Sequence, residues 1–286
     1  MPNYILNELF SNLAEFRDSA PNVESSATLQ ALNASAVSVR KMIRGIISED
    51  IWNTIIAESG TDARMYLRSA WANRIMYGES IFIAVSNRQN KKSDTYKYEL
   101  EAIKRQYIDN YYNAMDSLLA IISSTPSYDW ETTWIAQQMK DLKIKTVLDF
   151  ESYYHIDSSF LYFIRTVPIQ KKELLLTFNS YYEKIASRSD LLPNLNTALV
   201  YTILARTLKQ FDIIELPPTL RNYFDDNTLS RNGNTEREAI SSLAADFLGD
   251  AQSLLSNIDI ALTDASIDLN IGTNLNEEEN KYYGML

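Results

Sequence analysis

The residues most suited to chemistry are the single histidine of the chain, His155, and Asp157, two positions further on. A carboxylate beside an imidazole is the arrangement that orients a histidine as a general base. Side chains at i and i+2 share a face only in a β-strand, and no nucleophile motif stands near this pair. We therefore expect no catalytic role for His155, although its neighbourhood is the first place to inspect for an active site.

Metal and nucleotide sites have little support in the sequence. The chain has no Cys and one His, which excludes thiolate zinc sites and any site with two histidines on one helix. It contains no GxGxxG, GxxxxGKS/T or GxSxG motif. Asp268, Asn270 and Glu279 would stand at positions one, three and twelve of a calcium loop, but Gly272 falls at position five instead of six. We predict no catalytic residue, no cofactor and no metal ion.

Tyrosines and lysines offer two other kinds of candidate site. Rows of aromatic side chains can stack on sugars or bases, but at helical spacing they are more often half-buried core residues, and we interpret them so. We interpret Lys91-Lys92 and the group Lys140, Lys143 and Lys145 as solvated faces. The tyrosines concerned are Tyr107, Tyr111, Tyr112, Tyr153, Tyr154, Tyr181 and Tyr182.

The composition indicates that helices would have to position all of these residues. Hydrophobic residues make up 45% of the 286 and charged residues 22%, as in a soluble globular protein. Only seven Gly and seven Pro disfavour a turn-rich β fold. We expect no membrane-spanning helix and no secretory signal, because long apolar runs and a basic N-terminal region are missing. The lack of Cys fits a cytosolic origin.

The net charge of −10 is concentrated in the second half of the chain. Residues 1–125 carry 13 Lys and Arg against 14 Asp and Glu, whereas residues 126–286 carry 14 against 23. An acidic surface binds phosphate poorly, yet it suits a conduit through which DNA passes without sticking. A solvated face that keeps the protein soluble is the simpler interpretation, and the sequence leaves both open.

Apolar residues spaced by three and four predict helices along most of the chain. In the first half we predict helices over 37–57, 63–85 and 96–122, the second of them capped by Asp62. In the second half we predict helices over 131–142, 169–184, 191–211 and 235–262, with room for a short extended piece at 148–159.

Two local signals support the starts of helices in the second half. Pro168 is suited to the first turn of the helix over 169–184. Thr235 and Glu238 have the spacing of a capping box, in which each side chain accepts a hydrogen bond from the other residue's backbone.

An internal repeat is the strongest organising feature. Segments 101–118 and 238–255 share six identical residues in eighteen, and each half of the chain runs helix, helix, polar loop, long helix. We predict an all-α fold of two tandem, duplicated three-helix units packed as helical bundles. The predicted organisation is an N-terminal segment 1–35, units 36–125 and 126–263, and an extended acidic C-terminal tail 264–286.

Four stretches together carry a family resemblance: SAVSVRKMIRGIISEDIWNTII, ARMYLRSAWANRIMYGESIF, FLYFIRTVPIQKKELLLTFNSYY and LNTALVYTILARTLKQF. They resemble a family of helical proteins encoded by phages and prophages of Bacteroidetes. That family is in turn similar to the head–tail connector, or head-completion, proteins of tailed phages. The resemblance covers roughly residues 30–262 and rests on the apolar pattern, on Pro168 between helices and on Ala-rich second helices.

The resemblance implies a structural virion protein and no enzyme. A connector subunit forms a homo-oligomeric ring docked on the portal, contacts tail or adaptor proteins, and lets DNA pass through the lumen without specific binding or any membrane. The acidic tail would then line the channel or order against an adjacent subunit. The alternative is a soluble helical module of a Bacteroidetes-type cell that binds a peptide or glycan. That module would need an open aromatic groove and an export signal.

Overall fold

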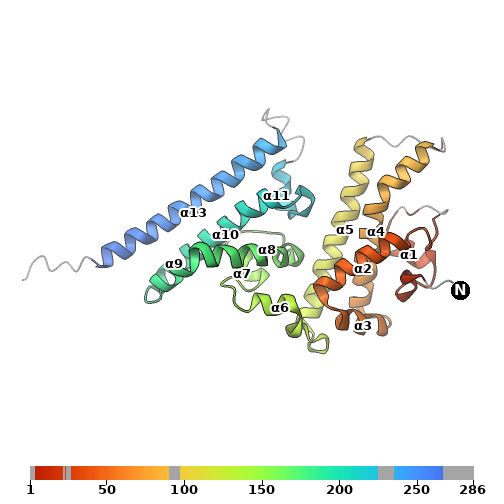
Figure 1. The fold of residues 1–286 in the computed structure, drawn as a ribbon, viewed down its shortest axis with the longest axis horizontal. Helices are drawn as coiled ribbons and strands as arrows, with labels where there is room; N and C mark the ends of the chain where they lie inside the picture. The colour runs from red at the N-terminus through yellow and green to blue at the C-terminus, as the bar shows by residue number, and fades with distance from the viewer. Residues whose placement is uncertain (1–3, 22, 24–26, 90–96, 225–234, 267–286) are drawn as a thin grey trace, which may run out of the picture.

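Helices account for all the regular structure in the described part of the chain. The structure is a computed structural model and describes residues 4–21, 23, 27–89, 97–224 and 235–266 (Figure 1). No strand occurs among these residues, so the predicted all-α class is confirmed. Below, the first half means the described residues up to the end of α5 (Lys97–Ser124), and the second half means the described residues after it.

The first half is built around a long helical hairpin of α4 and α5, on which the shorter N-terminal helices pack. Its core includes Trp52 and Trp71, whose rings meet edge to face with centroids 5.1 Å apart. The Trp71 indole N–H donates to the Ala36 carbonyl at 3.0 Å, which joins α2 to α4. The elements are η1 (Ile5–Glu8), α1 (Leu13–Ser19), α2 (Asn33–Ile47), α3 (Glu49–Ala57), α4 (Asp62–Gln89) and α5 (Lys97–Ser124).

Two predictions about the first half are wrong. The single helix expected over 37–57 is divided at Ser48, which has φ 77° and whose Oγ accepts the Ile51 N–H at 3.3 Å as the N-cap of α3. Apolar spacing continues through the break, which is why periodicity does not reveal it. The cap of α4 is Thr61, whose Oγ1 accepts the Arg64 N–H at 3.3 Å, while Asp62 is already the first helical residue.

The second half also contains a pair of long helices, α10 and α13, that pack on each other. Shorter helices follow α5 and connect the first half to this pair (Figure 1). The predicted capping box is confirmed: Thr235 Oγ1 accepts the Glu238 N–H at 3.3 Å, and Glu238 Oε2 accepts the Thr235 N–H at 2.9 Å. The elements are η2 (Pro126–Tyr128), η3 (Trp130–Thr132), α6 (Trp134–Met139), α7 (Val147–Glu151), α8 (Phe160–Glu173), η4 (Leu174–Phe178), α9 (Asn179–Lys184), η5 (Ser189–Leu191), α10 (Leu192–Gln210), η6 (Ile213–Glu215), α11 (Pro218–Arg221), η7 (Asn222–Phe224) and α13 (Glu236–Ser266).

Pro168 does not start a helix as predicted. It lies in the interior of α8, which begins eight residues earlier, and its ring is on the exposed side. The helix runs on without interruption through η4, a turn of π-helix, into α9. Residues 148–159, for which a short extended piece was considered, instead form most of α7 and the irregular turn that leads into α8.

The duplication is not confirmed and stays a prediction. Each half has a hairpin of two long helices, but α4 and α5 are separated by 90–96 alone, whereas η6, α11, η7 and further residues separate α10 from α13. The buried side chains form one continuous cluster that includes residues of both halves. The predicted boundary between residues 125 and 126 falls just after α5 ends at Ser124, and it stays a prediction as well.

Candidate functional site

A polar hollow opens where the helices of the second half meet α5. It has a volume of about 360 Å³ and continues into a larger hollow of about 720 Å³, with Arg105, Asp109 and Ile214 lining both. Charged and polar groups line the smaller hollow: Arg105, Asp109, Tyr112, Asn113, Asp116, Asp157, Ser159, Arg221 and Asn222.

Asp116, on α5, holds the N-terminus of α8. Its Oδ1 accepts the Leu161 N–H at 2.7 Å, next to the N-cap Ser159, whose Oγ accepts the Tyr162 N–H at 3.3 Å. Burial raises the pKa of the Asp116 carboxyl to about 6, and the hydrogen bonds from Leu161, Ser159 and Phe160 oppose this rise. A carboxylate from one half thus satisfies N–H groups that the first turn of a helix in the other half leaves unpaired.

Asp109, two turns earlier on α5, makes the second link across the hollow. Its Oδ1 lies 2.7 Å from Nη2 of Arg221, which is largely buried at the end of α11. Breaking a buried pair leaves an uncompensated charge, so this contact holds α11 against α5. A third link comes from Arg165 on α8, whose Nη1 lies 2.8 Å from Glu215 Oε1 and 3.2 Å from Tyr112 Oη.

A strained turn at Asp157 and Ser158 forms the far wall of the hollow. Both residues have positive φ, 55° and 52°, a conformation that is costly for residues other than glycine. Asp157 compensates by capping α11, because its carboxylate accepts the Thr219 N–H at 2.7 Å and the Thr219 hydroxyl at 2.9 Å. From the other side, Glu151 accepts the backbone N–H groups of Ile156, at 3.1 Å, and Ser158.

His155 lies at the outer edge of this turn, between two carboxylates. Its Nδ1 is 2.8 Å from Glu151 Oε2 and its Nε2 is 3.4 Å from Asp157 Oδ1, with the ring exposed. The hydrogen bond and charge of Glu151, followed by the charge of Asp157, raise the pKa of the imidazole. The structure brings together the predicted pair and adds Glu151, which lies one helical turn earlier. Glu151 also accepts backbone N–H groups of the turn, and Asp157 accepts the donors of Thr219 on α11. The carboxylates therefore hold the turn in shape and fix it to α11.

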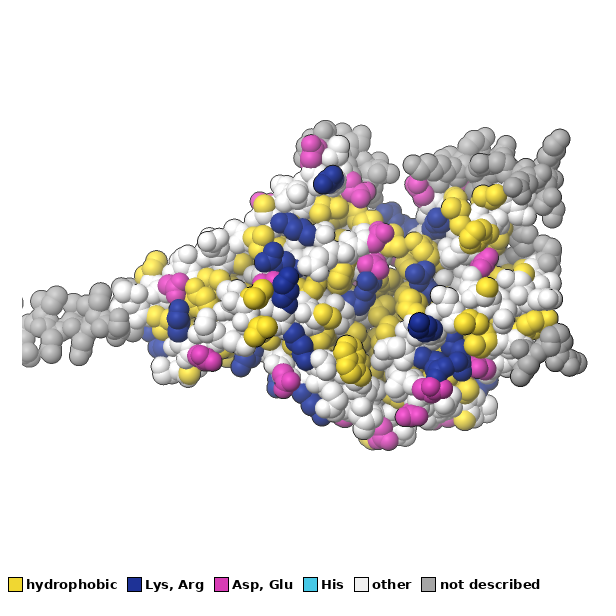
Figure 2. Space-filling model, in the orientation of Figure 1, with side chains coloured by type: hydrophobic (Ala, Val, Ile, Leu, Met, Phe, Trp, Pro, Cys, Tyr) yellow, Lys and Arg dark blue, Asp and Glu magenta, His cyan; other side chains and the backbone are white. Residues whose placement is uncertain are grey.

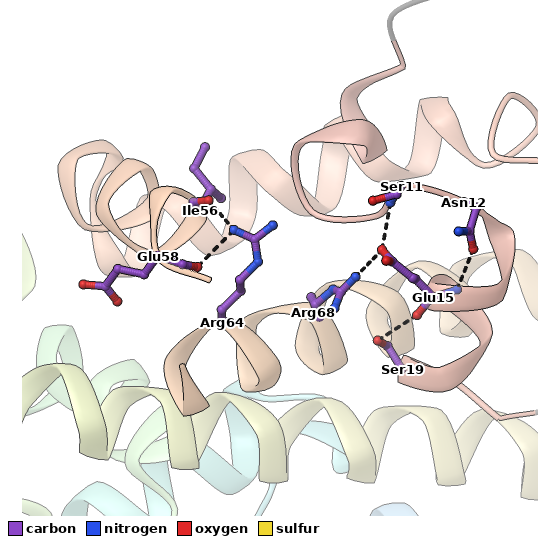
Figure 3. A network of polar contacts seen from close by, with 8 residues as sticks. All are labelled: Ser11, Asn12, Glu15, Ser19, Ile56, Glu58, Arg64 and Arg68. Atoms are coloured by element: carbon purple, nitrogen blue, oxygen red, sulfur yellow. Dashed lines mark hydrogen bonds and ion pairs between the residues drawn. The ribbon is translucent and has the colours of Figure 1, made fainter. Parts of the chain in front are cut away.

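A second polar cluster lies in the first half, where α1 and α3 meet α4 (Figure 3). Glu15 accepts the Ser11 N–H at 2.8 Å and pairs with Arg68 of α4. The Ser11 N–H, followed by Arg68, lowers the pKa of Glu15. One turn away, Arg64 Nη1 donates to the carbonyls of Ile56 and, at 3.1 Å, Glu58 at the end of α3. These contacts fix the N-terminal helices on α4.

The remaining predicted sites have mixed outcomes. The tyrosines are core residues, as interpreted: Tyr107 and Tyr111 are buried, and the other five are partly buried against the core. No group of three or more His, Asp or Glu in the described residues is placed to hold a metal ion. Asp268, Asn270, Gly272 and Glu279, like Lys91-Lys92, lie outside the described residues.

Sequence reasoning missed Asp116, Glu151 and the Asp109–Arg221 pair. Only Glu151 had a local signal, its position four residues before His155; the other contacts join residues 45 and 112 positions apart. Comparison with protein-family models, curated proteins and solved structures finds no match. Among the described helices, none combines the length and the apolar character needed to cross a membrane.

Proposed function

We propose that this chain is a structural virion protein, a head–tail connector subunit that forms a ring on the portal and acts without enzymatic chemistry. The ring would assemble in the cytoplasm of the host bacterium and contact the portal on one side and tail or adaptor proteins on the other. The proposal rests on the sequence resemblance together with one structural observation, the placement of exposed apolar side chains.

Apart from Leu175 and Leu176 on the α8–α9 helix, two groups of exposed large apolar side chains lie on α4 and on α6 and α7. On α4, Phe82 is 66% exposed, with Ile81 and Val85 beside it. On α6 and α7, Trp134 is 67% and Leu148 76% exposed. In Figure 1 the outer end of α4 lies at the top right, whereas α6 and α7 lie lower and nearer the middle, so the two places are well apart. A subunit that repeats head to tail around a ring needs two different contact surfaces, one for each neighbour.

The outer face of α13 supplies a surface suited to a DNA channel. Three carboxylates are exposed there, Glu238, Asp246 and Asp250. A surface of the same sign as the phosphate backbone releases no counterions when DNA approaches, so it does not hold the duplex. We place this face toward the lumen in the proposed ring.

Complementation between two single variants tests the proposal. Phe82→Asp and Trp134→Asp each remove one contact surface, and Ser242→Asp, on the exposed face of α13, is the matched control. Mass photometry and light scattering, with and without the portal protein, report the assembly. We expect oligomers for the wild type and the control and monomers for each variant. We expect dimers from the mixture, because each variant keeps one intact surface.

Two results would overturn the proposal. One is a wild-type protein that stays monomeric both alone and with its portal. The other is dimer formation by Phe82→Asp alone, since that would indicate a symmetric contact that closes after two copies.

A further inference from the structure

Two adjacent leucines on the long α8–α9 helix face solvent. Leu175 is 78% exposed and Leu176 is 65% exposed. Both belong to η4, the single π-helical turn, and turns of this kind occur frequently at functional sites. Successive residues of a helix point about 100° apart, so two exposed neighbours give the helix a broad apolar face.

Lysines flank this apolar face on two sides. Lys171 Nζ donates to Gln138 Oε1 of α6 at 2.6 Å, and Lys143 Nζ lies 4.8 Å from the ring centroid of Tyr182. Lys171 lies four residues before Leu175 on this helix, and Lys143 packs on Tyr182, seven residues after it, so the two lysines lie toward opposite ends of the apolar face. We call Lys143, Lys171, Lys172, Leu175, Leu176 and Tyr182 the Leu175 surface.

The charge of the Leu175 surface is opposite to that of the protein as a whole. The surface has three lysines, and the exposed acidic residues near it in the sequence are Asp141 and Glu183. Glu173 is buried and pairs with Arg206 at 2.9 Å, so it does not offset the lysines. Basic side chains gather beside hydrophobic ones over this part of the second half (Figure 2). In a chain with a net charge of −10, such a surface suits an acidic and apolar occupant.

The end of α13 lies against the same long helix. The Tyr181 hydroxyl donates to Asp259 Oδ2 at 2.8 Å, and Arg188 Nη1 donates to the Ala261 carbonyl at 3.3 Å. The described chain ends at Ser266, five residues or about 8 Å of helix beyond Ala261, and the 20 residues 267–286 follow it. Twenty residues can span up to about 70 Å, more than the roughly 37 Å of the continuous α8–α9 helix, so they can reach the Leu175 surface.

Residues 267–286 also have the required chemistry. They contain Asp268 and the run Glu277–Glu279 against a single Lys281. Their apolar residues are Ile267, Leu269, Ile271, Leu275, Tyr282, Tyr283, Met285 and Leu286. A tethered segment has an effective concentration in the millimolar range, so modest contacts are enough to keep it bound.

We propose that residues 267–286 bind the Leu175 surface of their own chain. The glutamates 277–279 pair with Lys143, Lys171 and Lys172, and apolar residues of the segment cover Leu175 and Leu176. The segment thus binds its own chain. The family resemblance implies instead that it lines the channel or orders against an adjacent subunit.

Cysteine cross-linking tests this binding directly, because the chain has no Cys and an introduced pair is the only pair of thiols. The test variant is Leu176→Cys with Tyr283→Cys. The control is Met65→Cys with Tyr283→Cys, since Met65 is also more than half exposed, 53% against 65% for Leu176, but lies in the first half and outside the proposed subunit contacts. A bismaleimide reagent joins the thiols, and denaturing gels separate cross-linked monomers from dimers over a hundredfold range of protein concentration.

We expect monomeric cross-linking of the test variant to be at least tenfold faster than that of the control and independent of concentration. Changing Glu277, Glu278 and Glu279 to Gln, or adding salt, should slow it severalfold. Equal rates in the two variants would overturn the proposal. Dimers as the main product, formed in proportion to concentration, would also overturn it, because the occupant would then be another copy.

Discussion

Replacing Asp116 with Asn should change the pH dependence of stability in a predictable direction. The folded state raises the pKa of this carboxyl from 3.8 to about 6, so the folded chain binds the proton more tightly than the unfolded chain does. Stability is therefore greatest below the unfolded pKa and falls as the pH rises to about 6. At neutral pH the ionised Asp116 lowers the free energy of unfolding by about 3 kcal/mol relative to its protonated form.

The Asn variant isolates this effect because its amide oxygen still accepts the Leu161 N–H but has no proton to exchange. Between about pH 4.5 and pH 7.5 the wild type should lose about 2 kcal/mol relative to the Asn variant. Asp116→Ala should show the same pH profile as the Asn variant at a stability lower by about 1–2 kcal/mol, since it leaves helix N–H groups unpaired.

Urea unfolding at a series of pH values, followed by tryptophan fluorescence and circular dichroism, gives these free energies. The difference between variant and wild type cancels the titration of every group that the two proteins share. A stability difference that stays constant across the pH range would refute the reasoning, because Asp116 would then titrate alike in the folded and unfolded chains.

Two further substitutions test the fold by urea unfolding. Ser48→Ala removes the cap of α3 but keeps the positive φ, and should cost about 1 kcal/mol, whereas Ser48→Gly relieves the strain and should stay within about 0.5 kcal/mol of the wild type. Arg206→Met leaves the buried Glu173 carboxylate unpaired and should cost about 3–5 kcal/mol. Adding Glu173→Leu should recover most of that loss, and a double variant no more stable than the single one would contradict the pairing argument.

The positions of the helices could be predicted from the sequence, but several boundaries could not. Periodicity locates α5 and α13, whose buried residues form one stripe, whereas α4 and α10 bury residues on several faces and are located by their length and by the turn residues that bound them. It cannot detect Ser48, since one residue with positive φ redirects the chain while the apolar spacing continues on both sides. The start of α8 was misplaced because Pro168 was interpreted as a residue of the first helical turn, whereas it lies on the exposed side within the helix.

The candidate site was harder to predict because its contacts join distant parts of the chain. His155 and Asp157 attracted notice as residue types. Their role in bracing a turn depends on Glu151 and on Thr219, which lies 62 positions from Asp157. Nothing in the local sequence marks Asp116 as the acceptor for α8. Such contacts become visible only when the helices are placed in space.

The bond between Asp116 and the start of α8 also sets an order for folding during synthesis. The acceptor precedes the Leu161 N–H by 45 residues, so α5 leaves the ribosome about 2–9 seconds before α8 at ordinary elongation rates. The first half can thus complete its hairpin and present the carboxylate before the helix that needs it appears. A chain started after α5 would lack this acceptor, and the Leu161 N–H at the start of α8 would bond to water instead.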